Sequence, residues 1–139
     1  TALDVTVQAQ ILSLLKNLTK ELGSSLILIT HDLGVVARYA DKVAVMYGGR
    51  IVETASALDL YKNPKHPYTN GLMASIPKLD GDPGSRLFTI EGQPPDLSDL
   101  PAGCAFHPRC PHVHEACRAG KPPLRSVAPN HELACFGYD

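Results

Sequence analysis

Residues 25–30 read SLILIT, an apolar run that sets the fold class expected for the first half of the chain. The run holds four consecutive leucine and isoleucine residues and no charge. A short unbroken run of this kind is typical of a strand that is buried on both faces, as in a parallel sheet covered by helices. We therefore expect residues 25–30 to form the central strand of an α/β layer.

The segment before this run has a helical pattern. Between residues 7 and 22, leucine and isoleucine recur at helical spacing, which predicts a helix with one buried stripe. Asp4 or Thr6 can cap the start of this helix, and Gly23 is well placed to end it. The run at residues 25–30 would then follow directly.

The segments after the run predict a second helix over residues 33–39 and a hairpin over residues 43–53, with a tight turn at Gly48-Gly49. From Ser56 onward the pattern changes to short helices joined by prolines, a loop over residues 77–86, a candidate strand over residues 87–91 and irregular structure beyond. We therefore predict two parts. Residues 1–58 close an α/β domain, and residues 59–139 form a smaller, irregular, Cys-rich extension.

His31 and Asp32 follow the apolar run and are candidates for chemistry. A histidine at the carboxyl end of a buried parallel strand projects into the crevice where open α/β sheets bind ligands, and it can hydrogen-bond a phosphate oxygen or an attacking water. The alternative is structural: a partly buried histidine at a turn, with Asp32 capping the next helix. Spacing alone favours the structural reading.

Three motifs in a fixed order resemble the ATP-binding subunits of ABC transporters. Residues 1–4 read TALD, like the D-loop of that family, residues 30–32 read THD, like its switch-histidine motif, and residues 45–53 read VMYGGRIVE, like the hairpin that follows. The resemblance implies that His31 senses the γ-phosphate of ATP. It also implies that Asp4 lies at the interface between two ATPase subunits, where it organises the opposite site. ATP and Mg²⁺ would be the cofactors of the parent protein.

Other parts of that family's ATP site are absent from the sequence. The chain has no GxxxxGK(S/T) phosphate loop, no LSGG signature, and no acidic strand end that would hold magnesium and a catalytic glutamate before the D-loop. Phosphoryl transfer depends on the positioning that these parts provide. We therefore expect this chain to be a C-terminal piece of a longer ATPase and, by itself, neither to bind ATP tightly nor to hydrolyse it.

The second half resembles a narrower group, the ATPases of bacterial oligopeptide and dipeptide importers. The matching segments are YKNPKHPYT at residues 61–69, EGQPPDL at residues 91–97 and LPAGCAFHPRC at residues 100–110. The resemblance implies a peptide-import ATPase. Its partners would be transmembrane permease subunits and a second ATPase subunit, identical or related. Its place would be peripheral, on the cytoplasmic face of the inner membrane.

Composition limits other partners. The net charge is −1 and no Lys/Arg cluster stands out, so we expect no nucleic-acid binding. No apolar run approaches the roughly 20 residues that a membrane span needs, and residues 1–4 do not begin a signal peptide. Membrane association is therefore expected only through partner proteins.

All four cysteines of the chain fall in its last part, with the spacing Cx5Cx6Cx17C: Cys104, Cys110, Cys117 and Cys135. Disulfides are disfavoured because an ATPase half-domain without a signal sequence belongs in a reducing compartment. Structural zinc usually has CxxC-type spacing, whereas a 4Fe-4S cluster tolerates wider spacing. The resemblance implies that some family members carry such a cluster at matching cysteines. We expect a 4Fe-4S cluster, with zinc and reduced or disulfide-bonded thiols as alternatives; four nearby histidines are candidates to replace one thiolate (His107, His112, His114 and His131).

A structural role for this centre follows from the weak local core, because the extension has few large apolar residues and would need a cross-link to hold its shape. Removal of the centre is then expected to unfold the chain beyond about residue 90. The alternative function is a metal-binding regulatory or interaction module, in which the α/β half is present but has no catalytic role.

Overall fold

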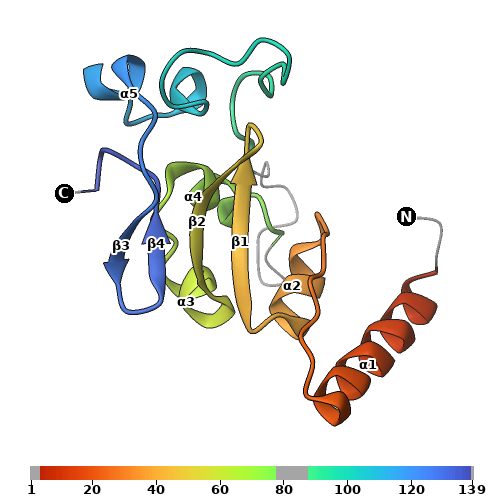
Figure 1. Ribbon diagram of the computed structural model, residues 1–139. Helices are drawn as coiled ribbons and strands as arrows, with labels where there is room; N and C mark the ends of the chain where they lie inside the picture. The colour runs from red at the N-terminus through yellow and green to blue at the C-terminus, as the bar shows by residue number, and fades with distance from the viewer. Residues whose placement is uncertain (1–3, 78–87, 139) are drawn as a thin grey trace. The chain divides into compact units, whose positions relative to one another are not determined.

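The computed structural model describes residues 4–77 and 88–138 and divides the chain into two compact units, Thr1–Asp41 and Lys42–Asp139. The hairpin predicted over residues 43–53 therefore lies in the same unit as the extension. Each unit is described by itself below (Figure 1). In the described part of the chain, no helix has both the length and the apolar composition that crossing a lipid bilayer requires.

The first unit contains two helices, α1 (Val5–Leu22) and α2 (Leu33–Tyr39). Asp4 caps α1 by accepting a 2.8 Å hydrogen bond from the N–H of Thr6, and Gly23 ends the helix in the left-handed region. Asp32 caps α2 through the N–H groups of Gly34 and Val35. Both helices and the Asp4 and Gly23 ends agree with the sequence prediction, because helix caps are set by local chemistry.

The prediction of a buried central strand over residues 25–30 is wrong for this structure. The segment has no regular secondary structure, and the side chains of Ile27 and Ile29 are 89% and 94% exposed. No strand of the described residues pairs with it. A strand becomes ordered and buried through the hydrogen bonds and packing of its neighbours, so an apolar run without neighbours stays irregular and exposed.

The second unit is built on a four-stranded sheet with the order β1-β2-β4-β3, in which all neighbours are antiparallel (Figure 1). Its strands are β1 (Lys42–Tyr47), β2 (Arg50–Ser56), β3 (Arg125–Ala128) and β4 (His131–Leu133). The β1–β2 hairpin confirms the prediction. The β3–β4 hairpin corrects the expectation that this region would be mostly irregular, since β4 extends the sheet from the far end of the chain. The predicted parallel sheet is replaced by an antiparallel one.

Two short helices follow β2: α3 (Ala57–Lys62) and α4 (Pro67–Ala74). The side chain of Ser56 accepts from the N–H of Asp59, and Pro67 occupies the first turn of α4, as the sequence predicts. Helix α3 packs on β1 and β2. The predicted loop at residues 77–86 lies almost wholly outside the described residues. Of the candidate strand at 87–91, the described residues 88–91 have no regular structure.

The extension packs against the hairpin and shares a core with it. Phe106, which is 2% exposed, contacts Tyr47 of β1 and Tyr68 of α4, with ring centroids 5.1 and 5.4 Å apart. A Cβ placed on Gly48, in the hairpin turn, would lie 2.8 Å from the Cβ of Ala105. Because the segment around Phe106 shares a core with β1 and α4, the extension and the hairpin form a single packed body.

Candidate functional site

The two candidate nucleotide-contacting residues, Asp4 and His31, are exposed and lie in the first unit. The carboxylate of Asp4 caps α1, and the hydrogen bond from the backbone of Thr6 lowers its pKa. His31 lies at the bend between residues 24–30 and α2. The neighbouring Asp32 caps α2, as the structural alternative predicts, but His31 is exposed and not partly buried. The roles that the resemblance gives to Asp4 and His31 stay predictions.

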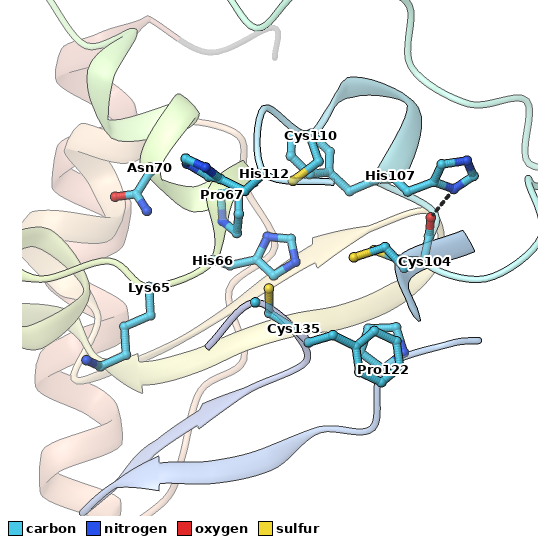
Figure 2. Close-up of a pocket in the computed structure, with 14 residues that line it drawn as sticks. Lys65, His66, Pro67, Asn70, Cys104, His107, Cys110, His112, Pro122 and Cys135 are labelled. Carbon is cyan, nitrogen blue, oxygen red and sulfur yellow. Dashed lines mark hydrogen bonds between the residues drawn. The ribbon is translucent and has the colours of Figure 1, made fainter. Parts of the chain in front are cut away.

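The four cysteines, in contrast, are brought together. Cys104, Cys110, Cys117 and Cys135 all line one pocket of about 150 Å³ in the second unit, and all four carry free thiols. Figure 2 shows the sulfur atoms of Cys104, Cys110 and Cys135 in this pocket. The four cysteines are widely spaced in sequence, but the fold brings them to one pocket.

Short local elements position these thiols. Cys104 and Cys110 flank a 3₁₀ turn (His107–Arg109), Cys117 lies in helix α5 (Glu115–Ala119), and Cys135 follows β4. The N–H of Cys104 donates to the carbonyl of Cys117 over 2.8 Å, which ties two of the four segments together.

This close approach of two backbones depends on Gly103. It has φ +74°, and a Cβ there would lie 2.4 Å from the carbonyl oxygen of Cys117. Only glycine combines that φ with the missing side chain at no cost. Gly103 therefore fixes the distance between the loop of Cys104 and helix α5.

Burial raises the pKa of three thiols, those of Cys104, Cys110 and Cys135, and the charges of the neighbouring cysteines raise these pKa values further. At neutral pH these thiols are protonated when nothing positive lies between them. A metal centre would reverse this, because a bound cation stabilises thiolates and displaces their protons.

Among residues 4–77 and 88–138, no three His, Cys, Asp or Glu side chains gather closely enough to hold one metal ion. Tetrahedral zinc requires such a group, with each sulfur about 2.3 Å from the metal. The four cysteines line one pocket without forming such a group within the described residues. Two of the candidate histidines are otherwise engaged: the Nδ1 of His107 lies 2.9 Å from the carbonyl oxygen of Cys104, and His131 pairs with Glu53.

His66 is a residue of this pocket that sequence reasoning missed. Its side chain is fully buried, and its Nδ1 accepts a 3.1 Å hydrogen bond from the N–H of Tyr68 at the start of α4. The side chain lines the pocket (Figure 2), and a hydrogen bond with the backbone of Ala134 acts on the imidazole and raises its pKa. Burial lowers the pKa of His66 to about 4, so the imidazole is neutral at pH 7. The signal in the sequence was the KHPY run at residues 65–68, which we interpreted only as a proline turn between helices.

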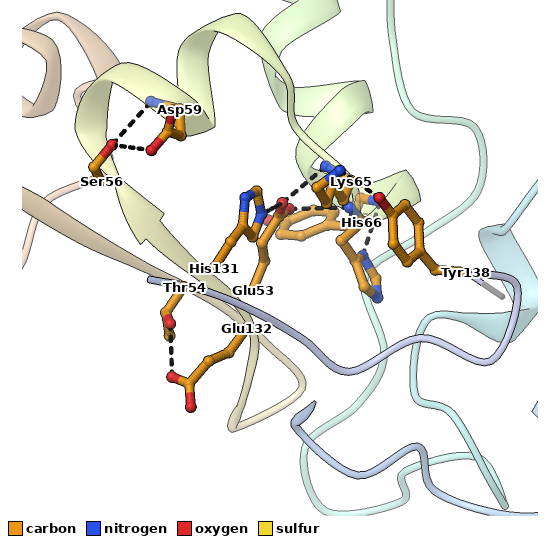
Figure 3. A network of polar contacts seen from close by, with 10 residues as sticks. Glu53, Thr54, Ser56, Asp59, Lys65, His66, His131, Glu132 and Tyr138 are labelled. Carbon is orange, nitrogen blue, oxygen red and sulfur yellow. Dashed lines mark hydrogen bonds and ion pairs between the residues drawn. The ribbon is translucent and has the colours of Figure 1, made fainter. Parts of the chain in front are cut away.

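A buried carboxylate holds His66 in place. Glu53 of β2 is fully buried and accepts hydrogen bonds from the backbone N–H groups of Lys65 and His66, at 2.8 and 3.0 Å (Figure 3). The Nε2 of His131, on β4, lies 2.7 Å from the same carboxylate. Glu53 therefore joins the sheet, the α3–α4 connection and the last strand at one point.

Comparisons with known proteins show which family this chain resembles. Residues 52–117 match the family described as "Oligopeptide/dipeptide transporter, C-terminal region". The chain is 52% identical, over 98% of its length, to the oligopeptide transport ATP-binding protein OppD of Salmonella typhimurium, and covers 40% of that protein. It is 53% identical to OppD of Mycobacterium tuberculosis, over 98% of the chain and 22% of that relative. A putative peptide import ATP-binding protein of Brucella ovis is 51% identical over 99% of the chain, which covers 42% of it. The chain thus spans less than half the length of each of these relatives.

Proposed function

This chain belongs to the ATP-binding proteins of bacterial oligopeptide and dipeptide ABC transporters, and we propose that it works as the C-terminal part of the ATPase that powers peptide import. One observation carries the proposal: about half of its residues are identical to those of peptide-transport ATP-binding proteins over nearly its whole length. The matched part covers 98% of the chain and therefore includes His31 and the four cysteines.

In this proposal the first unit contributes to nucleotide handling. His31 contacts the γ-phosphate of ATP, and Asp4 lies at the interface with a second ATPase subunit, where it organises the opposite site. The exposure of both side chains supports these roles, since a buried group could not reach a ligand or a partner. Mg²⁺ and the phosphates are held by other parts of the parent protein. Its partners are permease subunits in the membrane, so that the ATPase lies peripherally on the cytoplasmic face.

The second unit contributes a metal centre in this proposal. Cys104, Cys110, Cys117 and Cys135 hold a 4Fe-4S cluster, which cross-links the loops around them through four thiolate bonds. The pocket that all four cysteines line supports a common centre, and their wide spacing in sequence favours a cluster over zinc. With the centre removed by chelator, we expect protease to cleave the chain beyond about residue 90 more readily. Unchanged resistance would argue against the cross-link.

The nucleotide role is tested by joining this chain to the preceding part of a related ATPase and measuring phosphate release. We expect His31→Ala to lower Mg²⁺-dependent turnover by about 10²-fold or more while leaving ATP binding intact, because the imidazole acts on the reacting phosphate. Lys20→Ala, which removes an exposed cationic side chain from the last turn of α1, is the control and should keep full turnover.

Three outcomes are informative. Turnover that is equal in His31→Ala and in the unchanged protein contradicts the role of His31. A joined protein that binds no ATP favours the rival reading, a metal-binding module without catalysis. The 139-residue chain alone should release no phosphate, because its sequence has no phosphate loop.

A further inference from the structure

A short segment after β4, residues 135–138, has no regular secondary structure and lies beside the cysteine pocket. Residues 135–137 line that pocket together with the other three cysteines. Exposure rises along the segment, from Ala134, which is 6% exposed, to Tyr138, which is 37% exposed. One wall of the pocket is therefore a partly exposed stretch of chain and not a strand or a helix.

The residue before this segment is fixed to the sheet. The N–H of Ala134 donates a 2.8 Å hydrogen bond to the carbonyl oxygen of Val52 in β2. The backbone of Ala134 also forms a hydrogen bond with the buried side chain of His66. Strand β4, directly before Ala134, pairs with both β2 and β3. The segment therefore leaves the sheet at a residue that is held from two sides, and Ala134 can serve as its hinge.

The other end of the segment is held by two cations from different elements. The Nζ of Lys65, between α3 and α4, donates a hydrogen bond to the hydroxyl of Tyr138 and lies 4.5 Å from the centroid of its ring (Figure 3). The guanidinium of Arg125, on β3, donates to the carbonyl oxygen of Tyr138 and, over 3.4 Å, to that of Cys135. Charged donors make stronger hydrogen bonds than neutral ones, although water screens them at an exposed site.

We propose that residues 135–138 form a lid, hinged at Ala134, which controls how small solutes reach the thiols of the pocket, and that Lys65 and Arg125 hold this lid closed through Tyr138. Segments with few buried contacts open locally at a lower free energy than the core does. The lid can move while Ala134 stays paired with β2, so the pocket opens without unfolding of the sheet. The inference concerns access to the thiols, and it does not rest on the metal centre proposed above.

Two substitutions release the lid from opposite sides. Tyr138→Ala removes the hydroxyl and the ring that Lys65 contacts. Lys65→Met removes the ammonium group but keeps an apolar side chain and the backbone N–H that donates to Glu53. Because both substitutions remove the same contact, their effects should not add in the double variant. Lys62→Met is the matched control, since it removes an exposed cation from the last turn of α3 that does not line the pocket.

The measurement is the rate at which N-ethylmaleimide labels each cysteine of the metal-free, reduced chain, followed by mass spectrometry of its peptides. This reagent is neutral, so the loss of a cation does not change its attraction to the protein. We expect Tyr138→Ala, Lys65→Met and the double variant to label Cys104, Cys110 and Cys117 about 5–10-fold faster than the chain without substitutions. Lys62→Met should leave these rates unchanged.

Two results would overturn the inference: equal labelling rates in all variants, or faster labelling of Cys135 alone, which would show only fraying of the segment that carries it. Labelling in low concentrations of urea separates lid opening from unfolding. Opening of the lid exposes little surface, so the rates should hardly change with urea. Rates that rise steeply, in parallel with unfolding, would also overturn the inference. A chain that binds no metal would remove the proposed centre and leave the lid standing.

Discussion

At the scale of single residues, Glu53 and His66 contribute more to the stability of the second unit than their exposed neighbours do. Both are fully buried polar residues, and the carboxylate of Glu53 satisfies three donors from two other segments of the chain (Figure 3). A buried charge is tolerated only when it is paired in this way. Each residue therefore matters because of what would be left unpaired without it.

Glu53→Ala removes the acceptor of the Lys65 and His66 N–H groups and of His131. We expect a loss of about 3–5 kcal/mol in the free energy of unfolding, as for other broken buried pairs. Glu132→Ala, next to His131 on β4, removes one hydrogen bond from Thr54 and should cost only about 1 kcal/mol. Urea unfolding measures both. Equal losses in the two variants would mean that Glu53 does not hold the segments of Lys65, His66 and His131 together.

His66 makes stability depend on pH in a known direction. Its pKa is about 4 in the folded chain and near 6.5 when unfolded, so the unfolded state binds the proton first as pH falls. The stability that this group contributes is complete above pH 6.5 and is lost progressively toward pH 4, by about 3 kcal/mol in total.

Urea unfolding of the metal-free chain at several pH values tests this prediction. His66→Asn lacks the titrating group, so its stability should fall less steeply over the same pH range. Parallel curves for the two proteins would show that His66 titrates normally in the folded state.

Single residues differ in how far the sequence predicts them. The four cysteines were identified by their type and their isolation in the last part of the chain, and the structure places them on one pocket. His66 was not identified, because burial next to those cysteines depends on contacts between residues far apart in sequence. A proline after it signals only a local turn.

At the scale of elements, the local sequence was sufficient to predict those elements that need no partner distant in sequence. The caps at Asp4 and Ser56, the glycine end of α1 and the β1–β2 turn were all predicted and are present. Strands β3 and β4 were missed, since they are short and depend on pairing: β4 pairs with β2, which is distant in sequence, and β3 pairs with β4. Residues 25–30 show the opposite error: their apolar pattern needs neighbouring strands that the described residues do not provide.

The loop before Cys104 gives an element-scale prediction. Gly103 and Gly49 both have φ +74°, but a Cβ would meet the Cys117 carbonyl at Gly103 and nothing within 4 Å at Gly49. Gly49→Ala should therefore cost only about 1–2 kcal/mol for the left-handed backbone. Gly103→Ala should cost more, because the loop must also move away from α5. Chemical unfolding of the two variants compares these losses in the free energy of unfolding. Equal losses would show that Gly103 is not needed for the close approach of its loop to α5.

At the scale of the whole molecule, the two units differ in how complete they are. The second unit has a shared core around Phe106 and a sheet that β4 and β3 extend beyond the β1–β2 hairpin. The first unit exposes an apolar segment at residues 26–29 and several apolar side chains of α1, among them Val5, Leu14 and Leu22. The sequence predicted an α/β half with a distinct extension, but could not show that the hairpin packs with the extension, because that depends on the aromatic contacts of Phe106.

The exposed segment predicts self-association of the isolated chain, since unpaired apolar backbone of this kind is a template for pairing with a second copy. Replacing Ile27 and Ile29 by lysine should shift sedimentation toward the monomer. A variant with Gln10 and Asn17 replaced by lysine adds the same charge on the exposed side of α1 and should still associate. If the chain without substitutions is already monomeric at high concentration, the prediction is refuted.

The most direct test of the four-cysteine centre is the metal and sulfide content of the anaerobically purified chain. A 4Fe-4S cluster predicts brown protein with about four iron and four sulfide per chain, and Cys110→Ser should lose most of both. Colourless protein with one zinc per chain would replace the cluster by the alternative metal. Protein without any bound metal, and with four thiols free to react, would contradict the centre altogether.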